Sequence, residues 1–122
     1  MTVLLDSVIL IDHFNGVAAA TAYLREARGQ SVISAVTRAE VLAGVGVENA
    51  PLVKRFLDRF PILAIDREAA DLAADLRREH RWRLPDAFQA ALARLHRLKL
   101  VTRNTKDFPR EKFDFVVVPY AR

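Results

Sequence analysis

Short runs rich in apolar residues alternate with segments of helical periodicity along the whole chain. The short runs fall at residues 3–5, 30–34, 62–65, 100–102 and 115–118. Runs of this length are typical of strands, and nearly continuous apolar strands occur where both faces of a parallel sheet are buried. The pattern therefore predicts short strands that are covered on both sides.

The segments between these runs predict helices. In residues 17–28, Ala20, Tyr23, Leu24 and Ala27 recur at the spacing of one helix face, and Gly29 is expected to end that helix. Further helices are predicted over residues 8–14, 35–45, 51–59, 67–80 and 85–97, the first capped by Ser7 and the fourth by Asp66. Strands that alternate with helices form a parallel sheet between helical layers. We therefore predict one α/β domain over residues 1–122, with three αβα layers around a central, mostly parallel sheet of four to five short strands.

The composition fits a folded domain. Of the 122 residues, 52% are hydrophobic, which is enough for a core at this length. The absence of cysteine excludes a disulfide framework, a thiolate zinc site and a cysteine nucleophile. The first apolar run ends at Asp6, too early for a signal peptide, and no apolar stretch is as long as a membrane span. We expect a cytoplasmic protein without a membrane partner.

The net charge gives weak evidence about partners. Lys and Arg number 19 and Asp and Glu 15, so the formal net charge is +4, and the pI is about 10.0. Most of the cations are arginines, whose planar guanidinium suits phosphate groups. Many proteins of this charge bind no polyanion, so the charge alone does not establish nucleic-acid binding.

Asp6 directly follows the first predicted strand. Ligands of open parallel sheets bind beyond the carboxyl ends of the strands, so a carboxylate at this position is a candidate site residue. The alternative is that Asp6 or Ser7 only caps the helix that follows.

Glu40 shares one predicted helix face with Val36, Ala43 and Val47. We therefore expect its carboxylate to lie in apolar surroundings, where an acidic group needs a cation or a metal ion as its partner. The alternative is an ordinary ion pair. Arg38 is a poor partner, because it projects from nearly the opposite side of the helix.

Three further polar residues follow predicted strands or begin a helix. Asp86 lies in the first turn of a helix, where the helix dipole favours an acid, so simple capping is an alternative explanation. Asn104 and Asp107 follow the strand at residues 100–102, and the alternative for them is a turn built by their side chains.

Considered together, these acids predict a metal site. Several carboxylates at one end of a sheet repel one another and need a compensating cation. Oxygen ligands without cysteine favour Mg²⁺ or Mn²⁺ over zinc, and such ions on carboxylates perform phosphoryl chemistry.

The chain resembles the PIN-domain ribonucleases of the VapC toxin type. The resemblance rests on four segments in order: LLDSVILID at residues 4–12, ISAVTRAEVLAG at 33–44, LPDA at 84–87 and LVTRNTKDF at 100–108. It covers nearly the whole chain and implies a PIN-like domain. Val8 departs from the family pattern, which usually has a small polar residue beside the first Asp.

The resemblance implies specific roles for residues of this chain. Asp6, Glu40 and Asp86 would be the acidic metal-binding and catalytic set, with Asp107 as the fourth acid and Asn104 as its rival. The hydroxyl groups of Ser7, Thr37 and Thr102 would hold the carboxylates or metal-bound waters.

The resemblance also implies the activity and the partners. The protein would be an Mg²⁺-dependent endoribonuclease, with Mn²⁺ as a substitute, that hydrolyses RNA phosphodiester bonds as the toxin of a type II toxin–antitoxin module. A cognate antitoxin of the VapB type would neutralise it, and a homodimer is expected.

A basic segment precedes Asp86, and its arginines are candidate RNA contacts, as is Arg103. Arg81 and Arg83 lie in this segment, after Arg77, Arg78 and His80. The alternative is a solvated helix end, where cations suit the dipole. Trp82 could stack on a base, but we favour a place at the edge of the core. The three histidines show no ligand spacing.

Two alternative functions remain open on the sequence. The first is a catalytically weak or inactive PIN module that acts by binding RNA or protein, for which Val8 is the only support. The second is a phosphoacceptor receiver domain, in which Asp66, after the run at 62–65, would be the acceptor.

Overall fold

The computed structural model describes residues 2–121, and its centre is a five-stranded sheet in the order β3-β2-β1-β4-β5. All the pairs of neighbouring strands are parallel. The strands are β1 (Val3–Leu5), β2 (Ser31–Ser34), β3 (Ile62–Leu63), β4 (Lys99–Val101) and β5 (Val116–Val117). The prediction of a parallel α/β sheet is thereby confirmed.

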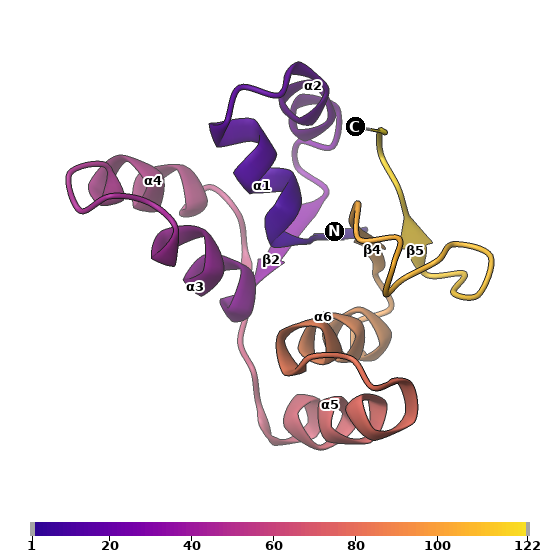
Figure 1. Ribbon diagram of the computed structural model, residues 1–122. Coiled ribbons are helices and arrows are strands. Elements are labelled where there is room, and N and C mark those ends of the chain that lie inside the picture. The colour runs from indigo at the N-terminus through magenta and orange to yellow at the C-terminus, as the bar shows by residue number, and fades with distance from the viewer. Residues whose placement is uncertain (1, 122) are drawn as a thin grey trace.

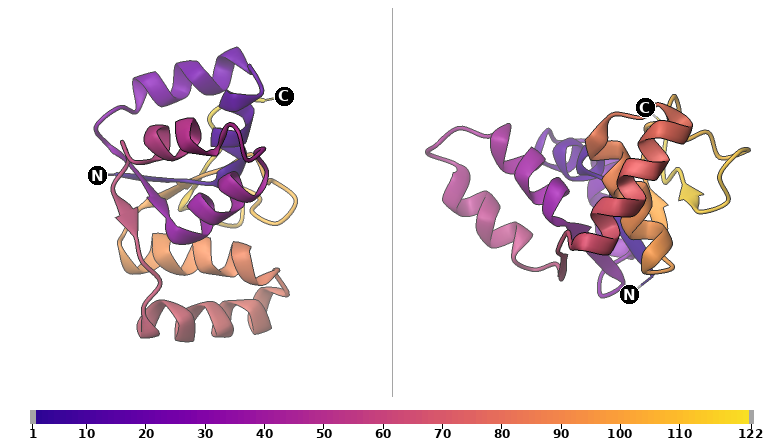
Figure 2. Two further views of the ribbon diagram at one scale, coloured as in Figure 1. Left: turned by 90° about the vertical axis from the view of Figure 1, so that its left-hand side faces the viewer. Right: turned by 90° about the horizontal axis from the view of Figure 1, so that it is seen from below.

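Six helices connect the strands within the described residues. They are α1 (Ser7–Phe14), α2 (Ala18–Glu26), α3 (Ala35–Ala43), α4 (Ala50–Leu57), α5 (Arg67–His80) and α6 (Leu84–Leu95). In Figure 1, α5 and α6 cover one face of the sheet, while α1 to α4 lie on the other side. The views in Figure 2 show the same three layers from the side and from below.

The alternation of side chains along the strands produces two cores. Leu4, Val32 and Leu100 point toward α5 and α6, where they pack with an alanine-rich helix surface. The next residue of each strand points the other way, so Leu5, Ile33 and Val101 pack with α1, α3 and α4. Because the central strands β1 and β2 are buried on both faces, apolar residues occupy successive positions in both.

Several predicted element ends were wrong by a few residues. Ser7 is the first residue of α1 rather than its cap, because the Asp6 side chain accepts a hydrogen bond from the Ser7 N–H and serves as the N-cap. Gly29 lies beyond the end of α2, which is capped at Ala27, and its φ of +83° belongs to the following turn. Helix α3 ends at Ala43, before the predicted residue 45, because Gly44 is its C-cap.

The third strand is shorter than predicted, and this bears on function. Only Ile62–Leu63 pairs, at the edge of the sheet. Asp66 follows as an exposed residue that caps α5, since its carboxylate accepts from the Ala69 N–H at 2.9 Å. A phosphoacceptor belongs at the end of a central strand, so this position does not suit a receiver domain.

Within residues 2–121, no helix has the length and apolar character needed to span a membrane.

Candidate functional site

The candidate site lies where two neighbouring strands end. Strands β1 and β4 are adjacent in register, with Leu5 opposite Val101, so the residues that follow them, Asp6 and Thr102, emerge side by side. The chain runs outward from β1 through β2 to β3 and then returns to β4 on the other side of β1. Such a reversal is the usual place for a ligand in an open parallel sheet.

The carboxylate of Asp6 is buried and held by three donors. Its Oδ1 atom accepts from the Ser7 N–H at 2.9 Å and from the Gln89 side-chain amide at 3.2 Å. Its Oδ2 atom accepts from the Thr102 hydroxyl at 2.6 Å. Asp6 therefore caps α1, which was one of the two alternatives that the sequence left open, and its membership of a functional site stays a prediction. The three donors leave a free lone pair on Oδ2.

Gln89 is a site residue that the sequence analysis missed. It is 1% exposed on α6, and its amide oxygen accepts from the Ser34 hydroxyl at 2.7 Å. Its amide nitrogen donates to Asp6 and also to the Thr37 hydroxyl at 2.6 Å. Thr37 therefore supports Asp6 indirectly, through Gln89. The only signal in the sequence was a glutamine among alanines one turn after Asp86.

Asp86 has a buried carboxylate oxygen that accepts no hydrogen bond from the described residues. It lies in the first turn of α6 and is 7% exposed, and its Oδ2 atom has no hydrogen-bond partner among the described residues. The Arg83 Nε atom lies 3.8 Å away, too far for a hydrogen bond. Burial, followed by the charges of Asp6 and Asp107, raises the pKa of Asp86 to about 6. Simple capping does not account for an acid in this state.

Glu40 lies near the same acids, but not for the reason the sequence suggested. Val47 is 88% exposed and lies beyond the end of α3, and Ala43 is also exposed, so the predicted apolar face is not buried. The helix instead buries Thr37 and Val41. The Glu40 carboxylate is half-buried, and burial raises its pKa, while a hydrogen bond with Ser7 lowers it.

The loop after β4 brings Asp107 to the site and assigns Asn104 a supporting position. The negative charge of Asp107 is one of the causes that raise the pKa of Asp86. The Asn104 amide donates to Asp107 Oδ2 at 3.0 Å, and the Asn104 backbone N–H donates to the Thr102 hydroxyl at 2.9 Å. The predicted side-chain turn is present, because the Asp107 N–H donates to Asn104 Oδ1 at 3.3 Å.

The four acids are near enough for their charges to interact, but their side chains do not form a complete metal-binding site. Asp86 is affected by the charges of all three others. Over residues 2–121, no three acidic or histidine side chains are close enough together to hold a metal ion as they stand. The side chains are nevertheless all carboxylates, which hard divalent cations prefer as ligands. The Asp86 Oδ2 atom, which has no hydrogen-bond partner among the described residues, and the free lone pair of Asp6 are available to such a cation.

The sequence matches a known protein family over most of its length. The model of the PIN domain matches residues 3–113. The chain belongs to the PIN domain family.

Individual relatives of this PIN domain agree with that assignment. It is 36% identical over 126 residues to Ribonuclease VapC10 of Mycobacterium tuberculosis, a match that covers 98% of this chain and 93% of the relative. It is 40% identical to a chain of a toxin–antitoxin complex from Klebsiella pneumoniae, with a TM-score of 0.88 and 98% of each chain covered. FitAcB from Neisseria gonorrhoeae, at 23% identity, shares the fold, with a TM-score of 0.79 over 97% of this chain and 98% of the other.

The arginines expected to contact RNA have different environments in this PIN domain. The Arg83 side chain is 81% exposed beside Asp86, and Arg81 is an exposed residue with a φ of 60° that ends α5. Arg103 is instead engaged with Asp12, to which its Nε and Nη2 atoms donate at 2.6 and 3.0 Å. Two of the five N–H groups of its guanidinium are therefore used by Asp12, and its contact with RNA stays a prediction.

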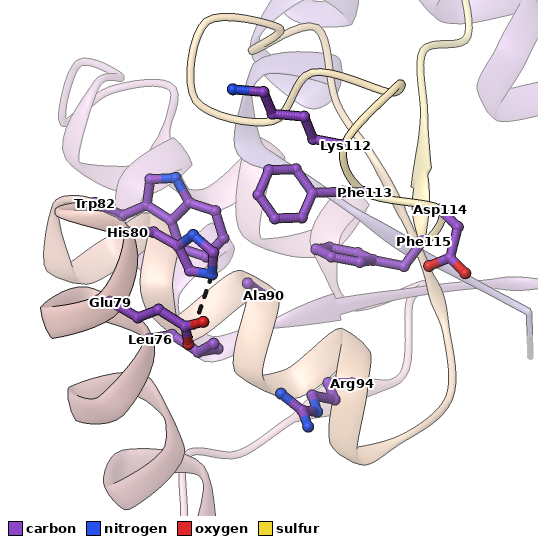
Figure 3. A pocket seen from close by; sticks show the side chains of 10 residues that line it. All are labelled: Leu76, Glu79, His80, Trp82, Ala90, Arg94, Lys112, Phe113, Asp114 and Phe115. Atoms are coloured by element: carbon purple, nitrogen blue, oxygen red, sulfur yellow. Dashed lines mark ion pairs between the residues drawn. The ribbon is translucent and has the colours of Figure 1, made fainter.

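Trp82 and His80 belong to an aromatic cluster rather than to the acidic site. Trp82 is 5% exposed, as expected for the edge of the core, and its indole N–H donates to the Asp107 carbonyl at 3.0 Å. His80 stacks on Trp82, with ring centroids 4.3 Å apart. Figure 3 shows both rings on the wall of a cavity of about 380 Å³, with Phe113 and Phe115 opposite. None of the four site acids lines this cavity.

Proposed function

We propose that this chain is a Mg²⁺-dependent endoribonuclease, with Mn²⁺ as a substitute, that hydrolyses RNA phosphodiester bonds. The observation that supports this most directly is Asp86 Oδ2, a buried carboxylate oxygen that has no hydrogen-bond partner among the described residues and lies near three other acids. Burying a charged carboxylate of this kind costs free energy unless a cation binds it. The name of the relative Ribonuclease VapC10 supports the same activity.

Asp6 and Asp86 would hold the metal ion, with Glu40 and Asp107 completing the acidic set. When bound, the ion supplies a polarised water and neutralises charge that develops on the phosphoryl oxygens. Thr102 and Gln89 orient the Asp6 carboxylate through the hydrogen bonds described above. The exposed Arg83 guanidinium stands beside Asp86, where it can bind a substrate phosphate.

We also propose that the protein is the toxin of a type II module and that an antitoxin of the VapB type neutralises it. The Klebsiella pneumoniae neighbour at 40% identity is part of a toxin–antitoxin complex. The chain offers a fitting surface between the end of α1 and α4, where Phe14 is 37% and Leu52 is 61% exposed. Arg55 and Arg59 line the same groove, which suits a segment that is both apolar and acidic.

The activity is tested by incubating purified, antitoxin-free protein with a mixed pool of RNA and Mg²⁺ or Mn²⁺. Cleavage is expected with either metal and not with EDTA. Asp86→Asn is expected to abolish it, because the neutral amide lacks the negative charge with which the carboxylate binds a divalent cation. Asp71→Asn, which alters an exposed acid on α5 outside the acidic set, is the matched control and is expected to cleave normally.

Cleavage that persists in EDTA or in Asp86→Asn would contradict the proposal. A folded protein that binds Mn²⁺ and RNA but cuts nothing in the pool would favour the alternative of an inactive PIN module. No acid of the set is missing from this chain, and Val8 packs against the core formed with α1, α3 and α4. Val8→Asn would then show whether the missing polar group limits turnover.

A further inference from the structure

A buried ion pair lies next to the loop that carries Asp107. Asp12, on α1, is 2% exposed and accepts two hydrogen bonds from the Arg103 guanidinium. Its Oδ2 atom also accepts from the Tyr120 hydroxyl at 2.8 Å. These three residues, here named the Asp12 cluster, join one helix, the loop after β4 and the C-terminal segment.

The Asp12 cluster and the candidate site both make hydrogen bonds to the short segment at residues 102–104. Arg103 lies between Thr102, which donates to Asp6, and Asn104, which donates to Asp107. Because Thr102 and Asn104 are bonded directly to Arg103 in the chain, a fixed Arg103 side chain limits how far either neighbour can move. Residues 102–107 belong to no helix or strand, and apart from the Asp12 cluster they are held by single hydrogen bonds such as those between Asn104 and Asp107.

We infer that the Asp12 cluster is a positioning device that holds residues 102–107 in place, so that Thr102 and Asp107 keep their places at the acidic site. This inference rests on the proposed function for its catalytic consequence, but the position of the loop can be measured without metal or RNA. The expected contact of Arg103 with RNA is a different role of the same side chain, and the Arg103→Gln variant distinguishes the two roles. A bidentate pair with a buried carboxylate resists rearrangement, since a single freed charge would be left buried.

The indole N–H of Trp82 provides a direct reporter. Trp82 is the only tryptophan in the chain, and its N–H donates to the Asp107 carbonyl at 3.0 Å. In an NMR spectrum of the metal-free, full-length protein, this proton gives one resonance whose position and solvent exchange depend on the placement of Asp107.

The test compares Asp12→Asn and Tyr120→Phe with the wild type. Asp12→Asn is expected to shift the indole resonance and speed its exchange at least tenfold, and to weaken Mn²⁺ binding by calorimetry about tenfold, with kcat lowered and KM for RNA unchanged. Tyr120→Phe removes a single hydroxyl and is expected to act in the same direction by about two- to threefold. Asp58→Asn is the matched control, because it breaks the exposed Arg38–Asp58 pair outside the site and should change none of these quantities.

The inference is overturned if folded Asp12→Asn keeps the wild-type indole resonance and binds Mn²⁺ within twofold of the wild type. It is also overturned if Arg103→Gln raises KM for RNA while the indole resonance and Mn²⁺ binding stay unchanged, which is the result expected of an RNA contact. Should Asp12→Asn not fold, Tyr120→Phe decides by the same criteria. A wild type that binds no Mn²⁺ would refute the proposed function alone, since the indole measurement still tests the positioning of the loop.

Discussion

The Gln89 side-chain amide donates a hydrogen bond to Asp6 across the interface between α6 and the end of β1, with 3.2 Å between Gln89 Nε2 and Asp6 Oδ1. Ser34 fixes the orientation of this amide, because its hydroxyl donates to the amide oxygen and leaves the nitrogen to face Asp6. The carboxylate at the centre of the site is therefore oriented by a side chain from a distant part of the sequence.

Replacing Gln89 with leucine should weaken the site without removing any acid. The substitution deletes one donor to Asp6 and leaves the buried Ser34 and Thr37 hydroxyls short of a partner. We expect a loss of about 1–3 kcal/mol in the free energy of unfolding and a fall in Mn²⁺ affinity of about tenfold. Urea unfolding and calorimetry measure these two effects. Gln30→Leu alters an exposed glutamine and serves as the control; equal effects of the two substitutions would exclude a specific role for Gln89.

The raised pKa of Asp86 predicts an unusual dependence of stability on pH. Its pKa is 3.8 when unperturbed and about 6 in the folded protein. Because the folded state holds this proton more tightly than the unfolded state, the contribution of Asp86 to the free energy of unfolding rises as the pH falls from about 7.5 through 6 toward 4. The full shift corresponds to roughly 3 kcal/mol. Burial raises the pKa of Glu40 too, so its contribution has the same sign.

Asp86→Asn isolates this contribution. In EDTA, the variant should be more stable than the wild type near pH 7.5, and the difference between them should shrink as the pH approaches 5. Urea unfolding at both pH values measures it, with Asp71→Asn as an exposed acid that should show no such difference. A variant less stable than the wild type at the higher pH would show that Asp86 acts mainly as a helix cap.

Substitution of Asp107 should lower Mn²⁺ affinity and cleavage more than substitution of Asn104. We expect Asp107→Asn to lower Mn²⁺ affinity and cleavage strongly, because it removes one of the four charges at the site. Asn104→Ala should have a smaller effect, since it removes only the donor to Asp107 Oδ2. Titration of each variant with Mn²⁺, followed by cleavage at saturating metal, measures both. The reverse order of severity would make Asn104 the fourth member of the set.

Trp82→Phe should reduce stability rather than RNA binding. The ring is 5% exposed and packs 4.8 Å from Phe108 between centroids, so the smaller phenylalanine leaves a void and removes the bond to the Asp107 carbonyl. We expect a loss of about 2 kcal/mol in the free energy of unfolding. The KM for RNA should stay within twofold of the wild-type value. A KM raised tenfold in a stable variant would instead indicate that a base stacks on Trp82.

The sequence alone determined the strands, their order of appearance, the position of Asp6 at the end of a strand and that of Asp86 at the start of a helix. Those features follow from local rules, because apolar runs are strands, and Asp6 and Asp66 cap the helices they precede. The four motif segments also indicated the family, which the match over residues 3–113 confirms.

Only the tertiary structure decided how those acids are supported. Gln89 and Asp6 are 83 positions apart, and Arg103 and Asp12 are 91 apart, so no local pattern relates the members of either pair. The predicted burial of the Glu40 face was wrong for the same reason, since the extent of α3 and the face it buries depend on what packs against it. Periodicity describes one element at a time, whereas a hydrogen bond between two elements depends on the packing of both against the sheet.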